Sequence, residues 1–409
     1  MSTRRQFLTV GAAGLFLPYG ARAAKGEFPS SGVERRIARH DFRGLTKEDV
    51  GTPALILDEA LFEKNLQTMA AHNQATGLKL RAHFKVHKCP QIAKRQVALG
   101  AIGICCATTA ESELLINSGI HGVLHTCQPA GRNQVSRAVA LARRDPTFTG
   151  VVDDPITVDA LEQALAAAHA QLKVVVDVFA GLDRQGCPPG EPALRLAQKV
   201  DQSKHLKLAG LMGYSGGASH THGWETRKKR STDDLAAMLE AVALCRKSGL
   251  PVEILTGGST GTYNIDTGNG LTELQAGSYV FMDTLYRRIG GKNDPSVYSD
   301  FEPALTVLTT VVSKTHPNKC AVDYGNKATL RTTDEVKDRH GVRVESDGAE
   351  YGMLLWNEGE RDINLGERVE IYPSNLDTSV NVFDRIYVAR GDSIVDVWPI
   401  MGRSGAPQR

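Results

Sequence analysis

The chain has 409 residues, 41% of them hydrophobic and 23% charged, and a formal net charge of +2. This globular composition contains no low-complexity tract, and its nearly balanced charge argues against a nucleic-acid-binding surface, which would be strongly basic. The seven cysteines are odd in number and scattered, without the spacing of a zinc site or of a disulfide framework. We therefore expect buried free thiols, most clearly at Cys105 and Cys106, which lie inside an apolar run.

Residues 1–23 have the three-part layout of an export signal. Arg4 and Arg5 precede an apolar run from Leu8 to Leu17, and Ala21-Arg22-Ala23 forms a small-x-small cleavage site. The paired arginines favour the twin-arginine route, and the apolar run is too short to span a membrane. We therefore expect a folded enzyme exported to the periplasm and free of the membrane after cleavage. The alternative is an irregular cytosolic N-terminus.

Residues 24–50 are polar without a clear period and predict a linker or a wrapping arm. From Thr52 onward, apolar runs alternate with amphipathic stretches. The predicted strands are Leu78–Phe84, Ala101–Ala107, Gly122–Thr126, Phe148–Val152, Lys173–Val178, Leu208–Tyr214, Val252–Thr256 and Glu273–Val280. The predicted helices include 61–75, 90–98, 110–117, 133–143, 156–170, 193–201 and 232–248. Eight strands alternating with helices predict a (β/α)8 TIM-like barrel over residues 51–297. The alternative is an open doubly wound sheet, but no glycine-rich dinucleotide turn follows the first strand.

The pattern changes near a turn-like stretch at residues 292–296. Beyond it, short strand-like runs are separated by turns, and long helical patterns are absent. These runs are Leu305–Val312, Cys320–Val322, Val342–Val344, Gly352–Trp356, Arg368–Ile371, Val380–Val388 and Ser393–Val397. They predict a C-terminal β domain over residues 298–409, packed on the barrel.

Function in a barrel of this kind belongs at the C-terminal ends of the strands. The first predicted strand ends in a basic cluster that contains Arg81, His83, Lys85, His87 and Lys88. Burial and neighbouring cations both lower the pKa of a lysine, so that its neutral amine can attack a carbonyl carbon. The cluster therefore indicates a Schiff-base lysine at Lys85. The alternative is a solvated basic loop.

Glycines and hydroxyl side chains follow the seventh predicted strand, from Gly257 to Thr262. Glycines allow close approach of the backbone, and N–H groups with hydroxyls can hold a phosphate. By itself the run is weak evidence, because a tight turn has the same composition. Together with Gly277-Ser278 on the neighbouring strand, it predicts a phosphate cup. A Schiff-base lysine beside a phosphate cup points to pyridoxal 5'-phosphate.

These motifs resemble those of the D-threonine aldolase and D-serine dehydratase-like family, which are pyridoxal-phosphate enzymes with the alanine racemase-type barrel of fold type III. The resemblance extends from about Thr52 to the C-terminus. It is carried by Thr52-Pro53-Ala54-Leu55, Arg81-x-His83-x-Lys85-x-His87-Lys88, Gly103–Thr108, Asp177…Asp183-Arg184-x-Gly186, Gly257–Tyr263 and Glu273–Asp283. This combination is highly specific to the family.

The resemblance implies roles for individual residues. Lys85 would form the Schiff base and act in catalysis, and Arg184 would contact the phenolic oxygen of the cofactor. The ring and phosphate would be lined by Thr108, Tyr214, Thr260, Gly277 and Ser278. Gln275 stands where racemases of this fold carry an arginine that faces the pyridine nitrogen. His220 would serve as a general base or as the partner of a metal-bound water, and the alternative is a loop histidine without a role. His83, His87 and Lys88 would tune the field around Lys85.

The family also uses a divalent metal, held by the C-terminal domain in a Pro-x-His-x-Asp or Cys motif. This chain departs from the motif, since Pro373-Ser374-Asn375-Leu376-Asp377 keeps the acid but replaces histidine by Asn375. An asparagine carbonyl suits hard ions such as Mg²⁺ or Mn²⁺ rather than Zn²⁺. We therefore expect Asp377 and Asn375 to hold a hard ion, to hold one weakly, or to hold none. The family's Glu-His-Gly becomes Glu350-Tyr351-Gly352, where Tyr351 would supply a proton.

The leading hypothesis is a lyase that cleaves 3-hydroxy D-amino acids to glycine and an aldehyde. The alternatives are a dehydratase acting on D-serine or 3-hydroxy-D-aspartate, an amino-acid racemase, and a protein that binds pyridoxal phosphate with little catalysis. The expected partner is a small amino-acid substrate, and a homodimer is expected by analogy with the family.

Overall fold

The computed structural model describes residues 29–359 and 362–403, so the predicted export signal at 1–23 lies outside the described residues. The described residues up to Asp41 form a unit of their own, and residues 42–403 belong to a second, larger unit. The predicted arm is partly helical, since it contains α1 (Pro29–Ala38) and the 3₁₀ turn η1 (Lys47–Asp49). Helix α1 was missed because its apolar stripe contains little beyond Val33 and Ile37.

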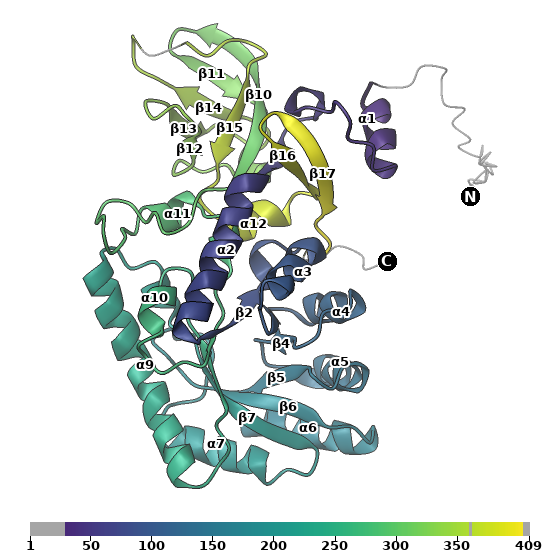
Figure 1. Ribbon diagram of the computed structural model, residues 1–409, viewed down its shortest axis with the longest axis vertical. Coiled ribbons are helices and arrows are strands. Elements are labelled where there is room, and N and C mark those ends of the chain that lie inside the picture. The colour runs from purple at the N-terminus through teal and green to yellow at the C-terminus, as the bar shows by residue number, and fades with distance from the viewer. Residues whose placement is uncertain (1–28, 360–361, 404–409) are drawn as a thin grey trace, which may run out of the picture. The chain divides into compact units, whose positions relative to one another are not determined.

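Eight parallel strands close into a barrel, as predicted (Figure 1). The strands are β2 (Lys79–His83), β3 (Gly103–Cys106), β4 (Leu124–His125), β5 (Thr149–Val152), β6 (Leu172–Asp177), β7 (Leu206–Gly213), β8 (Ile254–Gly257) and β9 (Glu273–Leu274). Each strand pairs with the next in chain order, and β9 closes the ring by pairing with β2. Every one of these strands lies within or beside a predicted apolar run.

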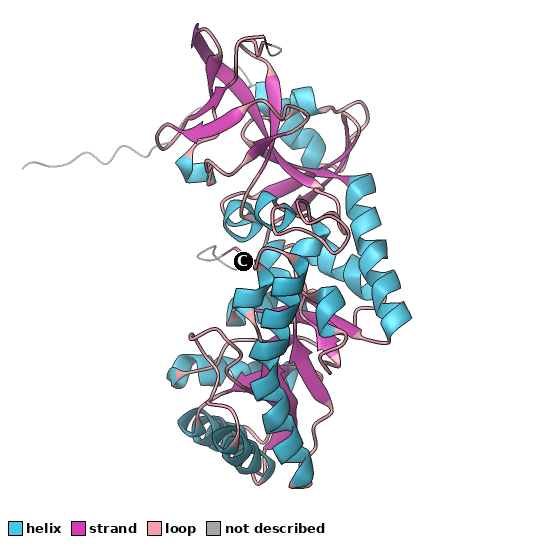
Figure 2. Cartoon of the chain, turned by 90° about the vertical axis from the view of Figure 1, so that its left-hand side faces the viewer, coloured by secondary structure: helices cyan, strands magenta, loops and turns pink. Residues whose placement is uncertain are grey.

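Helices cover the barrel strands, whereas the C-terminal part of the chain is mostly strand (Figure 2). The helices up to the end of the barrel are α2 (Glu59–Thr76), α3 (Pro90–Ala98), α4 (Thr109–Asn117), α5 (Gly131–Arg144), α6 (Pro155–Ala167), α7 (Glu191–Asp201), α8 (Gly216–Ser219), α9 (Trp224–Lys247), α10 (Tyr263–Asp266) and α11 (Thr284–Arg287). The 3₁₀ turns η2 (Phe84–Val86) and η3 (Ser278–Val280) follow β2 and β9. The predicted (β/α)8 fold is therefore confirmed.

The barrel interior explains why Arg81 does not reach the mouth. Its guanidinium makes a buried two-point ion pair with Glu273 of β9, at 2.8 and 2.9 Å. Gly103 leaves room for this pair, since a Cβ there would lie 2.9 Å from an Arg81 nitrogen and 2.1 Å from the Gly122 carbonyl oxygen. Arg81 thus belongs to the packed interior and not to the catalytic cluster in which the sequence placed it.

The C-terminal part forms a nine-stranded sheet that also recruits a strand from before the barrel. Its strands are β1 (Ala54–Asp58), β10 (Leu305–His316), β11 (Lys319–Val322), β12 (Glu335–Val336), β13 (Arg343–Ser346), β14 (Gly352–Leu355), β15 (Arg368–Tyr372), β16 (Arg385–Arg390) and β17 (Ser393–Pro399), with the 3₁₀ turn η4 at Asn326–Ala328. Strand β1 pairs antiparallel with β10 and parallel with β16. Residues 54–58 were assigned to the barrel from sequence, but they belong to this sheet.

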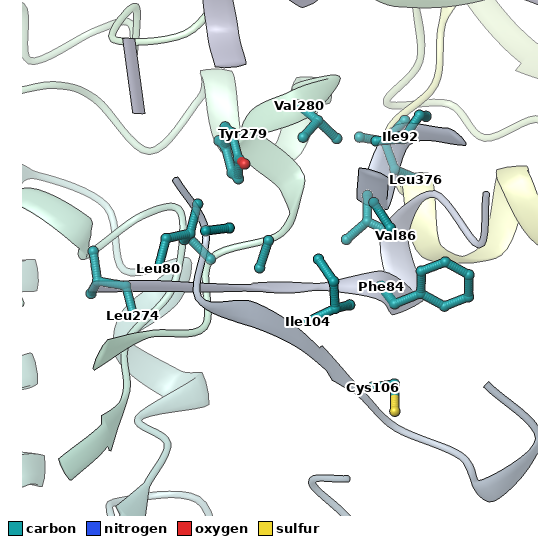
Figure 3. Close-up of a cluster of buried hydrophobic side chains, with 14 of the residues drawn as sticks. Leu80, Phe84, Val86, Ile92, Ile104, Cys106, Leu274, Tyr279, Val280 and Leu376 are labelled. Carbon is teal, nitrogen blue, oxygen red and sulfur yellow. The ribbon is translucent and has the colours of Figure 1, made fainter. Parts of the chain in front are cut away.

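One predicted strand begins as a helix. Residues 380–388 were expected to be extended, but α12 (Leu376–Asn381) precedes β16. Asn375 caps this helix, since its side-chain oxygen accepts a hydrogen bond from the Thr378 N–H at 3.2 Å. Leu376 is buried and lies beside Val86 and Ile92 of the barrel mouth (Figure 3). The start of α12 therefore connects the C-terminal sheet to the mouth of the barrel.

All seven cysteines are free, and six of them are buried, including Cys105 and Cys106. This agrees with the absence of a disulfide framework predicted from their number and spacing. Among the described residues, no helix combines the length and the apolar character that a membrane crossing requires.

Candidate active site

Lys85 lies on η2, directly after barrel strand β2. Its neighbours Phe84 and Val86 are buried in the core (Figure 3), which fixes the turn from both sides. The turn is capped by His83, whose Nδ1 accepts a hydrogen bond from the Lys85 N–H at 3.3 Å. The Lys85 carbonyl oxygen accepts a hydrogen bond from the Lys88 ammonium. A rigid turn therefore presents the Lys85 amine to the barrel mouth.

The Lys85 amine forms an ion pair with Asp377 of α12, with Nζ 3.0 Å from Oδ2. Burial lowers the pKa of Lys85, but the Asp377 carboxylate opposes this effect, and the pKa is raised on balance. The lowered pKa predicted from the basic cluster is therefore wrong. The predicted cations are present, but the Asp377 carboxylate, which lies near the C-terminal end of the sequence, has the larger effect on the pKa of Lys85.

In the rest of the basic cluster, His87 and Lys88 are buried and His83 is half-buried. The pKa of His83 is lowered well below its usual value, and that of His87 to about 3, mainly by burial. Lys88 also has a lowered pKa because of burial, although Glu111 and Asp377 oppose it. Its ammonium donates to the Asp377 carbonyl oxygen at 3.3 Å, so Lys88 helps to hold α12 against the barrel mouth.

A cavity of about 250 Å³ opens at the C-terminal ends of the barrel strands, and we call it the cofactor cavity. It brings together six of the predicted residues: Lys85, Arg184, Tyr214, Thr260, Gly277 and Ser278. His83, Cys127, Gln185, Ser259, Gln275 and Tyr286 also line it. Gln275 donates a hydrogen bond to the Thr256 hydroxyl at 3.0 Å, so a neutral side chain lies where racemases carry arginine.

Thr108 is not part of this cavity lining. Its hydroxyl caps α4 by accepting a hydrogen bond from the Glu111 N–H at 3.2 Å. The Glu111 carboxylate in turn accepts a hydrogen bond from the Thr108 N–H, also at 3.2 Å. This capping box occupies the side chain that was predicted to contact the cofactor.

The predicted phosphate cup, Gly257–Thr262, forms one end of the cofactor cavity. The Thr262 hydroxyl accepts a hydrogen bond from the Ser259 N–H at 3.1 Å, and the Thr260 hydroxyl accepts one from the Tyr279 N–H at 3.0 Å. Gly277 must lack a side chain, because a Cβ would lie 2.9 Å from Val86 and 3.0 Å from the His83 carbonyl oxygen. The cup is therefore braced by the turn that follows β9.

Arg184 stands next to a polar network that fixes its loop. Gln185 donates to the Asp177 carboxylate at 2.8 Å and to the Thr126 carbonyl oxygen at 3.1 Å. Gln128 donates to the same carboxylate at 3.0 Å. Burial raises the pKa of Asp177 to about 6, despite these hydrogen bonds. The loop that carries Arg184 is thus tied to the end of β6 and to the segment that follows β4, two strands separated by β5 in the barrel.

A second cavity of about 330 Å³ lies between the barrel mouth and α12, and we call it the vestibule. It shares Lys85, Tyr214, Ser278 and Tyr286 with the cofactor cavity. Its other lining residues are His220, His222, Asp283, Leu285, Ile289, Asn375 and Asp377. Lys85 therefore stands in the wall between the two cavities.

His220 and Tyr286 pack together in the vestibule, with ring centroids 4.4 Å apart. Burial lowers the pKa of His220, the Lys85 ammonium lowers it further, and Asp377 opposes both. The imidazole is therefore neutral at neutral pH and can accept a proton. Tyr286 was not predicted from sequence, since its polar and charged neighbours Thr284, Arg287 and Arg288 mark no strand end or motif.

Asp283 is a second residue that sequence reasoning missed. It is buried, and its carboxylate caps α11 by accepting a hydrogen bond from the Tyr286 N–H at 2.9 Å. Burial raises its pKa to about 7, and the charge of Asp377 acts in the same direction. Asp283 belongs to the matched motif Glu273–Asp283, and that membership was the available signal.

The two residues predicted to hold a metal, Asn375 and Asp377, both contact other protein groups in this structure. No group of three or more histidine, cysteine or acidic side chains within the described ranges has the geometry to hold an ion. Asp377 is paired with Lys85, and the Asn375 oxygen accepts hydrogen bonds from the N–H and hydroxyl of Thr378, both at 3.2 Å. Asp377 keeps one buried oxygen, Oδ1, without a hydrogen-bond partner, but this oxygen and one capping amide alone are a poor donor set for Mg²⁺ or Mn²⁺. Tyr351 is 52% exposed and lines neither cavity.

Comparison with known proteins identifies the family. The model of the alanine racemase N-terminal domain matches residues 57–285, and that of a putative serine dehydratase domain matches residues 304–389. The chain is 34% identical to the D-threonine aldolase of Arthrobacter sp., over 87% of this chain and 93% of that protein. The chain belongs to the D-threonine aldolase-like family of fold type III pyridoxal-phosphate enzymes.

Two further relatives cover the chain to a similar extent. The 3-hydroxy-D-aspartate aldolase of Paracoccus denitrificans (strain Pd 1222) is 30% identical over 88% of this chain and 94% of its own. The crystal structure of D-threonine aldolase from Filomicrobium marinum superposes with a TM-score of 0.84 at 37% identity, covering 88% of this chain and 98% of that one. Membership in the family makes this chain a pyridoxal-phosphate-dependent lyase.

The cofactor cavity of this aldolase-like protein fits pyridoxal phosphate. Lys85 offers the amine at one wall, and Ser259, Thr260 and Ser278 offer hydroxyls and N–H groups at the cup. A side chain at Gly258 would lie 2.8 Å from Leu274, so the backbone of the cup depends on glycine there, at a φ of +73°. The donor set and the close backbone approach both suit a phosphorylated aldehyde.

Proposed function

We propose that this protein cleaves 3-hydroxy D-amino acids by a retro-aldol reaction, giving glycine and an aldehyde. The observation that carries the proposal is the shared wall of the two cavities, where Lys85 stands between the cofactor cavity and the vestibule. The sequence similarity to D-threonine aldolase and 3-hydroxy-D-aspartate aldolase supports the same reaction.

When bound, pyridoxal phosphate supplies an aldehyde for the lysine and a ring that withdraws electrons from the substrate. The protein supplies the positions and the proton transfers. Asp377 orients the Lys85 amine through their 3.0 Å contact. The neutral His220 imidazole, packed on Tyr286, accepts the proton of the substrate 3-hydroxyl as the carbon–carbon bond breaks.

We further propose that the preferred substrate has an uncharged side chain. The vestibule contains two carboxyl groups, Asp283 and Asp377, together with the apolar side chains of Leu285 and Ile289. No arginine lines it among the described residues. A second substrate carboxylate would face like charges there without a bidentate partner. We therefore expect kcat/KM for D-threonine or D-phenylserine to exceed that for 3-hydroxy-D-aspartate by at least about tenfold.

The decisive experiment is product analysis on a panel of D-3-hydroxy amino acids, with and without chelator. Glycine and aldehyde in equal amounts support the proposal. Ammonia and a keto acid would identify a dehydratase, and a change of configuration at Cα without bond cleavage would identify a racemase. Cofactor binding with none of these products would leave a binding protein. A preference for 3-hydroxy-D-aspartate would contradict the substrate proposal while leaving the retro-aldol reaction intact.

We also propose export through the twin-arginine route and assembly as a homodimer. Support for export comes from Arg4-Arg5 and the apolar run that follows. Fractionation of cells, with the mass of the mature protein, tests it, and the double variant Arg4→Lys, Arg5→Lys should remain in the cytoplasm.

Support for the dimer is analogy with the family, and sedimentation analysis of the purified protein tests it. A monomeric species at micromolar concentration would contradict it.

A further inference from the structure

Arg227 of α9 is a buried cation outside both cavities. Its side chain is fully buried, and the hydrogen bonds it makes in the described part of the chain go to carbonyl oxygens and not to carboxylates. Burial of the guanidinium lowers the pKa of Arg227, opposed by Tyr298 and Asp300. A buried charge without an ion-pair partner is costly unless other groups compensate it. The contacts of Arg227 show which groups do so.

The guanidinium donates hydrogen bonds to carbonyl oxygens of three separate segments. Nε donates to Gly261 of the phosphate cup at 2.8 Å. Nη1 donates to Thr221, directly after His220, at 2.9 Å, and to Ile289 after α11 at 3.1 Å. Nη2 donates to Gly290 at 2.8 Å. The planar fork of arginine can bind all of these oxygens together, which a lysine ammonium cannot do.

Tyr298 completes the same arrangement. Its ring centroid lies 5.6 Å from the Arg227 guanidinium carbon, and its hydroxyl donates to the Thr260 carbonyl oxygen at 2.6 Å. The carbonyl oxygens of two consecutive cup residues, Thr260 and Gly261, thus accept hydrogen bonds from Tyr298 and Arg227. The cup also packs tightly on α8, because a Cβ at Gly261 would lie 2.1 Å from the Ser219 carbonyl oxygen. Movement of Arg227 would therefore disturb the cup and the His220 loop together.

We propose that Arg227 is a positioning residue with two effects on the cofactor. Its hydrogen bonds hold the phosphate cup and the His220 loop in one arrangement. Its positive charge, bonded to carbonyl oxygens and not to a carboxylate, lies one peptide group behind the cup and favours a phosphate dianion at that site. Backbone N–H groups and hydroxyls would bind the phosphate directly, while Arg227 acts through them. The proposal concerns cofactor binding and does not depend on which reaction the enzyme catalyses.

A role limited to the stability of the fold predicts a different result. General loosening of α9 would weaken the binding of any ligand in the cofactor cavity. A role at the cup weakens only ligands that carry the phosphate. Pyridoxal, which has the aldehyde and the ring but no phosphate, therefore separates the two explanations.

The test uses the full chain, resolved of cofactor and titrated with pyridoxal phosphate or pyridoxal by visible absorbance. For Arg227→Met we expect the Kd of pyridoxal phosphate to rise about tenfold or more, with the Kd of pyridoxal unchanged within about twofold. Arg230→Met is the matched control. Arg230 lies on the same helix and contacts the Thr221 hydroxyl at 3.4 Å, but it does not contact the cup. It should leave both constants unchanged.

Phosphorus NMR of the holoenzyme adds a readout of the charge. The bound phosphate should remain a dianion across neutral pH in the wild type and in Arg227→Lys. In Arg227→Met it should begin to titrate, because the cation is gone. Arg227→Lys should still weaken pyridoxal phosphate, because one ammonium cannot hold all of these oxygens. If Arg227→Met does not fold, Arg227→Lys and Tyr298→Phe must show the phosphate-selective loss. Equal weakening of both ligands, or no weakening, overturns the proposal.

Discussion

The two cavities that meet at Lys85 differ in origin. All residues that line the cofactor cavity lie between His83 and Tyr286, in or near the ends of the barrel strands. The vestibule needs Asn375 and Asp377, which enter from the C-terminal sheet. The first cavity keeps the motifs of the family, whereas the second lacks the histidine of the family's metal motif. The difference teaches that the residues that bind the cofactor and the residues that face the substrate hydroxyl can vary independently in one chain.

The largest expected effect comes from Lys85→Ala, because Lys85 belongs to both cavities. We expect no covalent adduct with pyridoxal phosphate after borohydride reduction, and a loss of cleavage activity of at least about 10³-fold. Mass spectrometry and an aldehyde assay measure these two outcomes. An adduct of unchanged yield would show that another lysine forms the covalent link. The comparison of two cavities that share Lys85 would then have no basis.

Asp377→Asn should affect adduct formation in the cofactor cavity and cleavage in the vestibule differently. Asp377 raises the pKa of Lys85, so its removal lets burial lower that pKa, and the neutral amine should appear at lower pH. Adduct formation with pyridoxal phosphate should therefore shift to lower pH, while cleavage falls about 10²-fold. Stopped-flow absorbance across pH measures the shift. Asp384→Asn, which removes a distant ion pair with Arg403, should change neither property. A shift to higher pH would contradict the assigned role of Asp377.

His220→Gln tests the vestibule alone. We expect kcat for cleavage to fall by about 10 to 100-fold, with the Kd of pyridoxal phosphate unchanged. Because burial lowers the pKa of His220, the imidazole is neutral at pH 7, and wild-type activity should fall only on the acid side. In the variant, the activity should depend less on pH on the acid side of the profile. His222→Gln on the same loop is the control, and an equal loss there would show that His220 has no special role.

Asp283→Asn should change how stability depends on pH. The folded pKa of about 7 exceeds the ordinary value of 3.8, so the folded state binds more protons than the unfolded state between these values. Wild-type stability is therefore full below about pH 4 and falls as pH rises to 7. The variant should gain on the order of 2 kcal/mol over wild type at pH 8, and little at pH 4. Asparagine retains the cap of α11. Urea unfolding at the two pH values measures this, and a gain independent of pH would refute it.

Asn375→Ala should have the smallest effect. Loss of the α12 cap should cost about 1 kcal/mol of unfolding free energy, and Asn375→Asp should restore it. Because Asn375 and Asp377 are engaged within the protein, chelator should change the cleavage rate by less than about twofold in the wild type. Calorimetric unfolding and a chelator series test the two statements. A rate that collapses with chelator and returns with Mn²⁺ would contradict our description of the vestibule.

The cofactor cavity was largely predictable because its parts are local. Buried barrel strands are apolar runs, and the residues that follow them, such as Lys85 and Gly277, must gather at one edge. Thr108 lies outside the lining of that cavity. The Thr108…Glu111 spacing, which is the pattern of a capping box, was the signal for its place at the start of α4.

The vestibule was less predictable because its contacts connect distant segments. Nothing near Lys85 in the sequence indicates that Asp377 reverses the direction of its pKa shift. The strand predicted at 380–388 begins too early, in the last turn of α12, because Val380 and Val382 are β-branched, although Asn375 is a common helix cap. Tyr286 and Asp283 line the vestibule only because folding brings η3, α11 and α12 together.

Strand β1 has a consequence for the order in which the molecule forms during translation. It pairs with β16, one of the last strands to leave the ribosome, and such long-range pairing is slow. All the cofactor-cavity residues are synthesised well before β16. A chain that ended before α12 would keep the lysine for the vitamin-derived group but would lack the Asp377 carboxylate that pairs with it.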